Sequence, residues 1–378
     1  MKTNLFTAII LLIFAVSCSK DSEIGNQFIF NDAEVDDNLK INQLQYLGSH
    51  NSYKKQMEPE LFEFLIGFNS LFPEDVNELD YYHLPLKEQF EKYGVRKLEL
   101  DFYADLNGGR FYNRGGNAFI GKPIESGISV LLEPGNKVMH IADIDFETHH
   151  YTLSDAFREV KAWSKNNPTH LPIFIMLETK ASTIFDQIEL FQNFATAEPW
   201  DLERLNVIEQ EILSVFNTED IIKPDDVRGN FNTLNEAVLQ NGWPTVGESR
   251  GKVMFLFDQK NINSIYRQGN ASLEGKLIFT DSNPGDPDGA FVKRNNAFSS
   301  DIADLVAQGY LVRTRADAGT IEARTGDFSR LNAALQSGAH FISTDYYRPD
   351  PRYVESTEWT DYKVELENHS YQLNPITN

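Results

Sequence analysis

The chain has very little cysteine, with Cys18 as its only one among 378 residues. An intramolecular disulfide is therefore impossible, and the fold must be stable without one in any compartment. Basic residues are also scarce, because 34 Lys and Arg face 56 Asp and Glu and give a formal net charge of −22. A surface of this sign repels phosphate groups, so we expect no nucleic-acid partner and no tight electrostatic adsorption to an anionic bilayer.

The N-terminus contains an apolar run, residues 8–16, that is too short to cross a bilayer. A lysine precedes this run and a small residue follows it, which is typical of a cleaved signal peptide. The sequence "AVSC" that ends at Cys18 resembles a bacterial lipobox, which implies cleavage before Cys18 and lipid attachment to its sulfur. The alternative is that Cys18 is merely the last residue of a signal region. We expect a signal peptide at 1–17, an acidic tether at 18–40, and a membrane anchor at Cys18 that places the protein in the bacterial cell envelope, periplasmic or on the outer surface.

From residue 41 onward, short apolar runs alternate with stretches of helical spacing, which is typical of parallel βαβ construction. No glycine-rich nucleotide fingerprint follows any of the runs, which disfavours an open doubly wound sheet. We therefore expect an α/β fold, a single monomeric (β/α)8 TIM-type barrel at 41–378. The eight strand candidates are residues 44–49, 96–103, 137–141, 172–178, 252–258, 277–281, 310–316 and 340–346.

Two connections, 104–136 and 216–251, are too long to be simple links between neighbouring elements. Long insertions in a barrel usually lie as loops or lids over the catalytic face. We expect both insertions there. At the first candidate strand, "YLGSHNSY", we expect Gly48 and Ser49 to let the chain leave the strand tightly.

The second candidate strand alternates in character, since Leu98, Leu100 and Phe102 share one face and Glu99 and Asp101 share the other. If the apolar face packs under the helices, the two carboxylates point into the barrel. Unpaired carboxylates there would cost several kcal/mol to desolvate unless a cation or hydrogen-bonding partners accept them. Hard oxygen donors favour Ca²⁺ or Mg²⁺ over zinc, and an Arg or Lys inside the barrel is the alternative.

Polar residues also follow the other early strand candidates, at the carboxyl ends where barrel enzymes carry out chemistry. Two histidines stand beside three carboxylates on four successive candidates, which favours a functional interpretation over isolated structural residues. The residues are His50, Asn51, Glu99, Asp101, His140, Glu178 and Lys180.

The motifs "GSHNSY", "LELDFY", "MHIADID" and "FIMLETK", in this order, resemble the phosphatidylinositol-specific phospholipase C superfamily, particularly its calcium-dependent bacterial branch. The resemblance runs from about residue 44 to about 348 and includes "DSNPGDPDGAFVKRNN" and "FISTDYY". It implies a TIM-type barrel that cleaves a phosphoinositide or a related phosphodiester, with a substrate hydroxyl as the nucleophile and a cyclic phosphate as the product.

Residue by residue, the resemblance implies His50 as the general base and His140 as the general acid. An imidazole can accept and donate a proton near neutral pH, so both roles are chemically reasonable. It implies that Ca²⁺ is held by Asn51, Glu99, Asp101 and Glu178. Lys180, Arg313 and Arg315 either bind phosphate or sugar hydroxyls or balance the carboxylates inside the barrel. Asp345 either orients a His or Arg or accepts backbone hydrogen bonds.

Three other functions stay open. A glycerophosphodiester phosphodiesterase is a sister family on the same barrel, but its members typically have Arg after the first His, where this chain has Asn51. A hydrolase of another sugar phosphodiester would keep the chemistry and change the headgroup. A non-catalytic barrel that binds sugar phosphates would not need two histidines.

Overall fold

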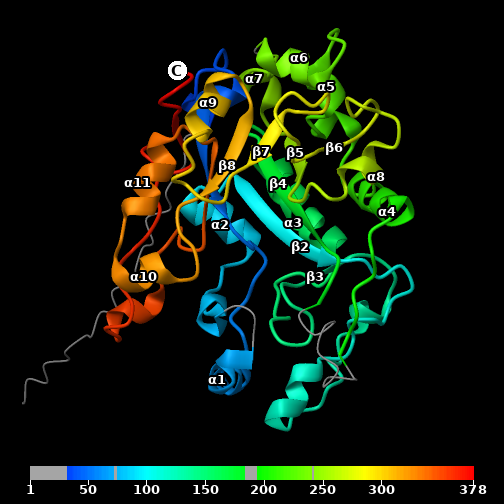
Figure 1. Cartoon of the computed structure of the whole chain (residues 1–378), viewed down its shortest axis with the longest axis vertical. Helices are drawn as coiled ribbons and strands as arrows, with labels where there is room; N and C mark the ends of the chain where they lie inside the picture. Colours follow the sequence, from blue (N-terminus) through cyan, green and yellow to red (C-terminus); the bar gives the residue numbers. More distant parts are fainter. Residues whose placement is uncertain (1–31, 72–74, 184–193, 241) are drawn as a thin grey trace, which may run out of the picture.

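The protein forms a nearly closed barrel of eight parallel strands with helices between them (Figure 1). The computed structural model describes residues 32–71, 75–183, 194–240 and 242–378. The parallel strands are β1 (Leu44–Ser49), β2 (Lys97–Tyr103), β4 (Ile173–Lys180), β5 (Val253–Phe257), β6 (Ile278–Phe279), β7 (Phe291–Lys293), β8 (Leu311–Arg315) and β9 (Phe341–Thr344). They are ordered β6-β5-β4-β2-β1-β9-β8-β7, and a parallel bridge between Asp281 and Phe291 joins the two ends. The predicted TIM-type barrel is confirmed.

One of the eight predicted strand positions is wrong, and one barrel strand was not predicted. Residues 137–141 contribute only β3 (Lys137–Val138), which pairs antiparallel with β2 outside the parallel barrel. The apolar side chains that follow β3, such as Met139, fill a separate hydrophobic cluster instead. The barrel strand that the sequence analysis missed is β7, whose short apolar stretch lies within a segment rich in Gly, Pro and Asp. A further antiparallel strand, β10 (Tyr371–Leu373), pairs with β1.

The helices cover the outside of the barrel (Figure 1). Thr152 caps α3 by accepting a hydrogen bond from the Asp155 amide. The α-helices are α1 (Pro59–Gly67), α2 (Leu86–Tyr93), α3 (Leu153–Asn166), α4 (Leu202–Leu213), α5 (Pro224–Arg228), α6 (Leu234–Leu239), α7 (Val246–Ser249), α8 (Asn263–Arg267), α9 (Ile302–Ala307), α10 (Ile321–Thr325) and α11 (Ser329–Gln336). The 3-10 helices are η1 (Asp32–Glu34), η2 (Ile41–Gln43), η3 (Asn69–Leu71), η4 (Val76–Leu79), η5 (Gly115–Ile120), η6 (Ser129–Leu132), η7 (Thr218–Asp220) and η8 (Pro351–Val354).

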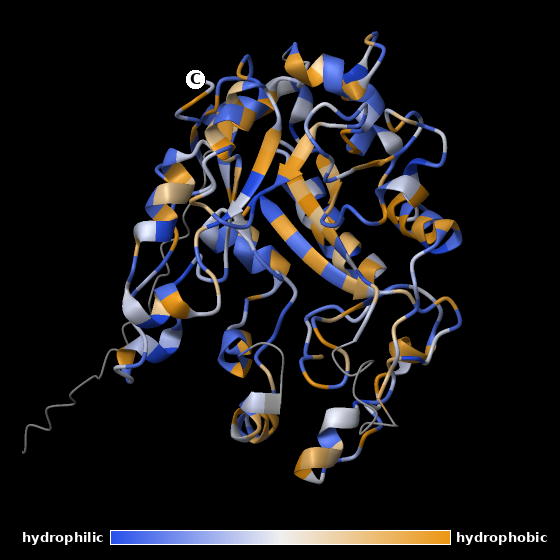
Figure 2. Cartoon of the chain, in the orientation of Figure 1, coloured by the Kyte–Doolittle hydropathy of each residue, from blue (hydrophilic) through white to orange (hydrophobic). Residues whose placement is uncertain are grey.

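The barrel interior is lined by aromatic side chains at its amino-terminal end and by charged side chains toward its carboxyl end. The ring of Phe174 lies 4.8 Å from that of Tyr46 and 4.5 Å from that of Phe341 between ring centroids. The alternation of hydrophobic and hydrophilic residues along β2 is visible in Figure 2.

Gly48 lies within β1, where an added Cβ would be 2.8 Å from Cδ of Lys97. Gly48 therefore makes room for a buried lysine, and our expectation that it forms the tight exit of the strand is wrong.

The two long insertions lie at opposite ends of the barrel. Insertion 104–136 joins α1 in a second hydrophobic cluster, which contains Leu61, Phe111 and Leu131, beyond the carboxyl end of β2 (Figure 1). Segment 216–251 instead forms η7 and α5 to α7 ahead of β5, at the amino-terminal end of the barrel. The expectation that both insertions cover the catalytic face is thus wrong for 216–251.

Residues 32–40, which we expected to be part of the tether, pack on the barrel. The carboxylate of Asp32 is buried and accepts hydrogen bonds from Arg96 and from the Leu171 amide at 2.7 and 3.0 Å. The predicted signal peptide and Cys18 lie outside the described residues. Among the helices that the structure describes, none has the length and apolar character to cross a membrane.

Candidate functional site

His50 stands directly after β1, at the carboxyl end of the barrel. Its Nδ1 lies 2.8 Å from Oδ1 of Asp345, which follows β9, and its Nε2 lies 3.4 Å from a guanidinium nitrogen of Arg315. Its carbonyl oxygen is bonded to Nε2 of His83 at 2.6 Å. Burial and the charge of Arg315 lower the pKa of His50, whereas Asp345 raises it. His50 is therefore held as a mainly neutral imidazole near pH 7, with its ring orientation fixed by Asp345.

His140 has an equivalent arrangement in the segment that follows β3. Its Nδ1 lies 2.7 Å from Oδ2 of Asp145, and the other oxygen of Asp145 lies 3.0 Å from Nζ of the buried Lys54. The side chains of His140 and His50 are 17% and 16% exposed, so both rings are largely enclosed but reach the surface. Burial lowers the pKa of His140, and the hydrogen bond to Asp145 raises it.

The sequence did not point to the partner of His140 and left the partner of His50 as one of two alternatives. Asp145 lies within "MHIADID", but it has no role in our expectations, and we left Asp345 undecided between orienting and structural roles. The structure resolves this for Asp345, which bonds to His50 and at 2.8 Å to Arg315. Although burial opposes ionisation, His50 and Arg315 lower the pKa of Asp345 to about 2. A usable signal for Asp145 is its spacing of five residues after His140, across a turn closed by two backbone hydrogen bonds between Ile141 and Asp145.

Asp101 and Glu178 lie side by side, because their Cα atoms are register partners on the parallel strands β2 and β4. Nζ of Lys180 lies 2.9 Å from a carboxylate oxygen of each. Burial and the neighbouring charge of Glu178 raise the pKa of Asp101 well above its usual range. Although burial opposes it, Asp101 and Glu178 raise the pKa of Lys180. The ammonium of Lys180 thus occupies the space between two converging carboxylates.

Asn51 is held next to His50 in the left-handed region, with a φ of 47°. Its Nδ2 donates a 2.7 Å hydrogen bond to the hydroxyl of Tyr81, while its buried Oδ1 has no hydrogen-bond partner. The carboxylate oxygens of Asp101 are also buried and accept no hydrogen bond of good geometry, and their one close partner is the ammonium of Lys180, 2.9 Å from Oδ2. Buried oxygen atoms of this kind are costly unless something binds them.

These oxygen donors fit a hard cation such as Ca²⁺, which prefers carboxylate and amide oxygens. The donors that fit are Asn51, Asp101 and the half-buried Glu178. Within the described part of the chain, no group of three or more His, Cys, Asp or Glu is already arranged to hold a metal ion. The ion would therefore require Lys180 to move away from the two carboxylates.

Glu99 is the exception among the four expected calcium ligands. Arg313 on β8 donates 2.9 Å hydrogen bonds to both of its oxygens, and Lys97 bonds to one of them. A contact between β2 and β8 crosses the interior of the barrel, so Glu99 does point inward as the alternation predicts. Although burial opposes ionisation, Arg313 and Lys97 hold the pKa of Glu99 well below its usual range. The charge of Glu99 is thus balanced by basic side chains, which is the alternative to a metal ion that we left open.

The two arginines of β8 differ in surroundings. The side chain of Arg313 is 1% exposed and bonds to Glu99, Ser343 and Asn295 inside the barrel. Arg315 is 16% exposed and lies beside His50 at the mouth. Of the two, Arg315 is placed to contact a substrate.

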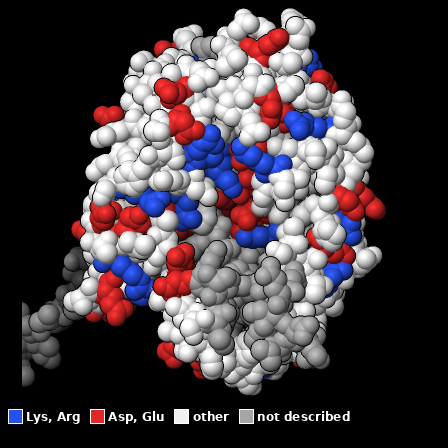
Figure 3. Space-filling view, in the orientation of Figure 1, with Lys and Arg blue, Asp and Glu red and all other residues white. Residues whose placement is uncertain are grey.

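Basic and acidic side chains gather in a hollow on the face shown in Figure 3. The mouth also contains an ion pair that the sequence analysis did not identify, between Lys293 at the end of β7 and Asp258 after β5, with Nζ 2.5 Å from Oδ2. Burial and the charge of Glu178 raise the pKa of Asp258 to about 6. Ion pairs thus cross the barrel from β2 to β8 and from the end of β5 to β7.

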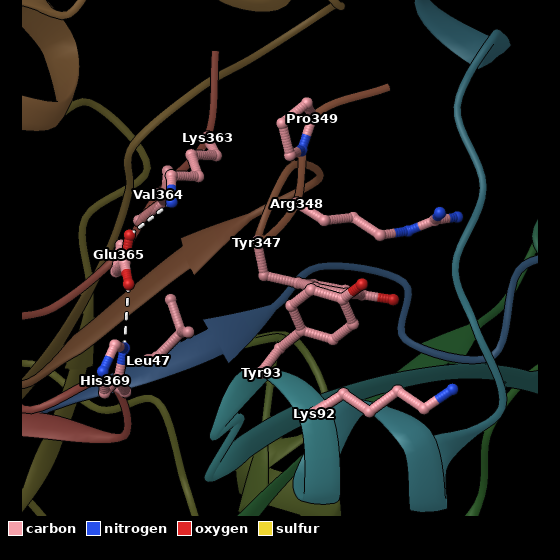
Figure 4. A pocket seen from close by; sticks show the side chains of 10 residues that line it. All are labelled: Leu47, Lys92, Tyr93, Tyr347, Arg348, Pro349, Lys363, Val364, Glu365 and His369. Atoms are coloured by element: carbon pink, nitrogen blue, oxygen red, sulfur yellow. Dashed lines mark ion pairs between the residues drawn. The ribbon is translucent and has the colours of Figure 1, made fainter. Parts of the chain in front are cut away.

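A separate pocket of about 180 Å³ lies between the end of α2, the segment after β9 and residues 363–369 (Figure 4). Glu365 forms ion pairs with Lys363 and His369 in its wall, at 2.5 and 2.8 Å. The ring of Tyr347 forms another part of the wall and stacks on His83, 5.3 Å away between centroids. The pocket therefore adjoins His83, which bonds to the carbonyl oxygen of His50. Neither His50 nor His140 lines it.

Comparison with known proteins identifies a family and several similar structures. A sequence model of the family described as "Phosphoinositide phospholipase C, Ca2+-dependent" matches residues 39–375. A calcium-dependent phosphoinositol-specific phospholipase C from Pseudomonas sp is 16% identical, with 89% of this chain and 96% of that chain covered and a TM-score of 0.49. A Ca²⁺-dependent phosphatidylinositol-specific phospholipase C from Streptomyces antibioticus is 15% identical, with 82% and 95% covered and a TM-score of 0.48. Comparison with curated protein sequences gives no match.

Proposed function

The chain belongs to the family of Ca²⁺-dependent phosphoinositide phospholipases C, which are phosphodiesterases, and on this premise we propose that it cleaves an inositol phospholipid or a closely related phosphodiester to a cyclic phosphate. The observation that carries the proposal is the pair of largely enclosed imidazoles, His50 and His140, each with Nδ1 on a buried carboxylate. A binding protein has no need for two imidazoles oriented in this way.

In the proposed reaction, Nε2 of His50 takes the proton from the attacking hydroxyl of the substrate. Asp345 accepts the hydrogen bond from Nδ1 and stabilises the imidazolium that forms. Nε2 of His140 donates a proton to the departing alcohol oxygen, and Asp145 keeps the proton on Nδ1. Because the attacking hydroxyl belongs to the same molecule as the phosphorus, attack is intramolecular and gives a cyclic phosphate.

The cation would be held by Asn51, Asp101 and Glu178, whose oxygen atoms are of the type that Ca²⁺ prefers. When bound, Ca²⁺ neutralises negative charge on the phosphate oxygens in the transition state. Arg315 adds a guanidinium beside His50 that is suited to the same phosphate. Lys180, once displaced from Asp101 and Glu178, remains at the mouth and can bind a phosphate oxygen or a sugar hydroxyl.

A comparison of three substrates tests this function. Purified protein with Ca²⁺ is supplied with phosphatidylinositol, glycerophosphoinositol or glycerophosphocholine, and the products are followed by ³¹P NMR. We expect a cyclic inositol phosphate from at least one of the first two substrates. Release of choline with no inositol product would favour a glycerophosphodiester phosphodiesterase instead.

We also propose that a lipid on Cys18 anchors the protein to the bacterial cell envelope, with the barrel carried outside the hydrocarbon layer. The support is the lipobox-like sequence before Cys18. Cells grown with labelled fatty acid should yield labelled wild-type protein and an unlabelled Cys18→Ala variant. Equal labelling of the two proteins would refute the anchor.

A further inference from the structure

Lys54 is a fully buried lysine between the two proposed catalytic histidines. Its Nζ lies 3.0 Å from the carbonyl oxygen of Leu79, 3.1 Å from that of Tyr81 and 3.0 Å from Oδ1 of Asp145. The two carbonyl oxygens accept hydrogen bonds from the ammonium and Asp145 balances its charge, so the buried Lys54 is engaged inside the protein and does not face a substrate. The ammonium also lies 4.9 Å from the centre of the Tyr81 ring.

The groups that contact the ammonium of Lys54 belong to segments that bind His50 or His140. On one side, Asp145 bonds to Nδ1 of His140. On the other side lies the segment 79–83. Its Tyr81 hydroxyl accepts the hydrogen bond from Asn51, and Nε2 of His83 bonds to the carbonyl oxygen of His50 at 2.6 Å. The backbone amide of His83 also donates to the carbonyl oxygen of Lys54 at 2.9 Å.

We propose that Lys54 is a positioning residue that fixes the two catalytic imidazoles relative to each other, by holding Asp145 behind His140 and the segment 79–83 behind His50. The proposal rests on the function proposed above. Lys54 lies four residues after His50, and every contact described for it is internal, so it acts through other residues and not on the substrate. Displacement of reacting groups by about 1 Å can reduce the rate about 100-fold. Loss of the contacts that Lys54 makes could therefore reduce the rate by misplacing the imidazoles.

The charge of Lys54 also reaches His140. The charged and titratable groups around His140 include Asp145 on its own loop, Lys180 and Glu178 on β4, Lys54 after β1, and Tyr103 on β2, whose hydroxyl lies 3.4 Å from the carbonyl oxygen of His140. Asp145 raises the pKa of His140, whereas Lys180 and Lys54 lower it. Removal of the charge of Lys54 should therefore raise the pKa of His140, which a purely structural lysine elsewhere would not do.

The chain offers a matched control in Lys137. Its side chain is also fully buried, and its Nζ is bonded to the carbonyl oxygens of Glu133 and Gly135 at 2.6 and 2.8 Å and lies 3.6 Å from Asp105. Lys137→Met therefore removes the same set of contacts, two carbonyls and one carboxylate, from a site without a contact to either histidine pair. Both variants should lose similar stability.

The experiment compares Lys54→Met and Lys137→Met for activity with Ca²⁺ and for the pKa of His140, measured by NMR on protein labelled at histidine. We expect Lys54→Met to lower kcat about 10-fold to 100-fold with little change in KM, as loss of groups that orient a site does, and to raise the pKa of His140. Lys137→Met should leave both at the wild-type value. Equal effects of the two variants, or wild-type kcat in Lys54→Met, would overturn the proposal.

A second variant covers the case in which Lys54→Met does not fold. Lys54→Arg keeps the charge, but its longer side chain has to displace Asp145 or the segment 79–83. We expect a lower kcat with an unchanged pKa of His140, and a wild-type kcat would overturn the proposal. Failure of the proposed function itself is recognised separately, because wild type would then give no cyclic phosphate or His140→Ala would retain full activity.

Discussion

The ion pairs around Glu99 predict how much stability the barrel loses when this carboxylate is neutralised. Glu99, Lys97 and Arg313 are at most 2% exposed. Glu99→Gln therefore leaves two buried cations without their shared anion, and breaking a buried pair in this way costs about 3–5 kcal/mol of the free energy of unfolding. This is a large part of the about 5–15 kcal/mol that stabilises an ordinary domain.

The assay is urea unfolding of wild-type and Glu99→Gln protein in the presence of a calcium chelator, followed by circular dichroism. The control is Glu88→Gln, which neutralises an exposed partner of Lys92 at the same kind of distance, 2.7 Å, and should cost at most about 1 kcal/mol. Suppose instead that Glu99→Gln costs less than about 1 kcal/mol in chelator but abolishes Ca²⁺ binding. Glu99 would then be a calcium ligand, and our account of its ion pairs would be refuted.

Three further predictions follow from the site. His50→Ala and His140→Ala should each reduce kcat by about 100-fold or more with little change in the unfolding midpoint; an active variant would remove that histidine from the mechanism. A chelator should abolish activity and added Ca²⁺ restore it, and Asp101→Asn should weaken Ca²⁺ binding measured by calorimetry; unchanged binding would exclude Asp101 as a ligand. Burial and the charge of Asp345 raise the pKa of Asp317 from 3.8 to about 7, so the folded state binds this proton more tightly and stability should fall as pH rises from about 4 to 7. Asp317→Asn should weaken this dependence without removing it, because the pKa of Asp258 is also raised, to about 6, and an unchanged slope between pH 4 and 7 would contradict the shift.

Much of the barrel could be predicted from the sequence because buried parallel strands are short apolar runs with helical stretches between them. The prediction failed where tertiary packing decided the outcome. The apolar residues after Val138 became part of a second core with α1. The strand β7 has only three residues, so its apolar pattern is too short to stand out among the turn residues around it.

The candidate site was predictable in its residue types but not in its pairings. The alternation in β2 predicted that Glu99 faces inward, and no local pattern could show that Arg313 reaches it across the barrel. Likewise, the partner of His50 is Asp345, which lies 295 residues further along the chain. Such contacts follow from closure of the barrel, which one sequence does not encode in any local spacing.

The most direct test of the account is a single-turnover reaction with phosphatidylinositol and Ca²⁺, followed by ³¹P NMR, for wild type, His50→Ala and His140→Ala. We predict that wild type gives a cyclic inositol phosphate and that neither variant does. A wild-type reaction without any cyclic phosphate, or cyclic product from both variants at the wild-type rate, would contradict the claim that these two imidazoles carry the proton transfers.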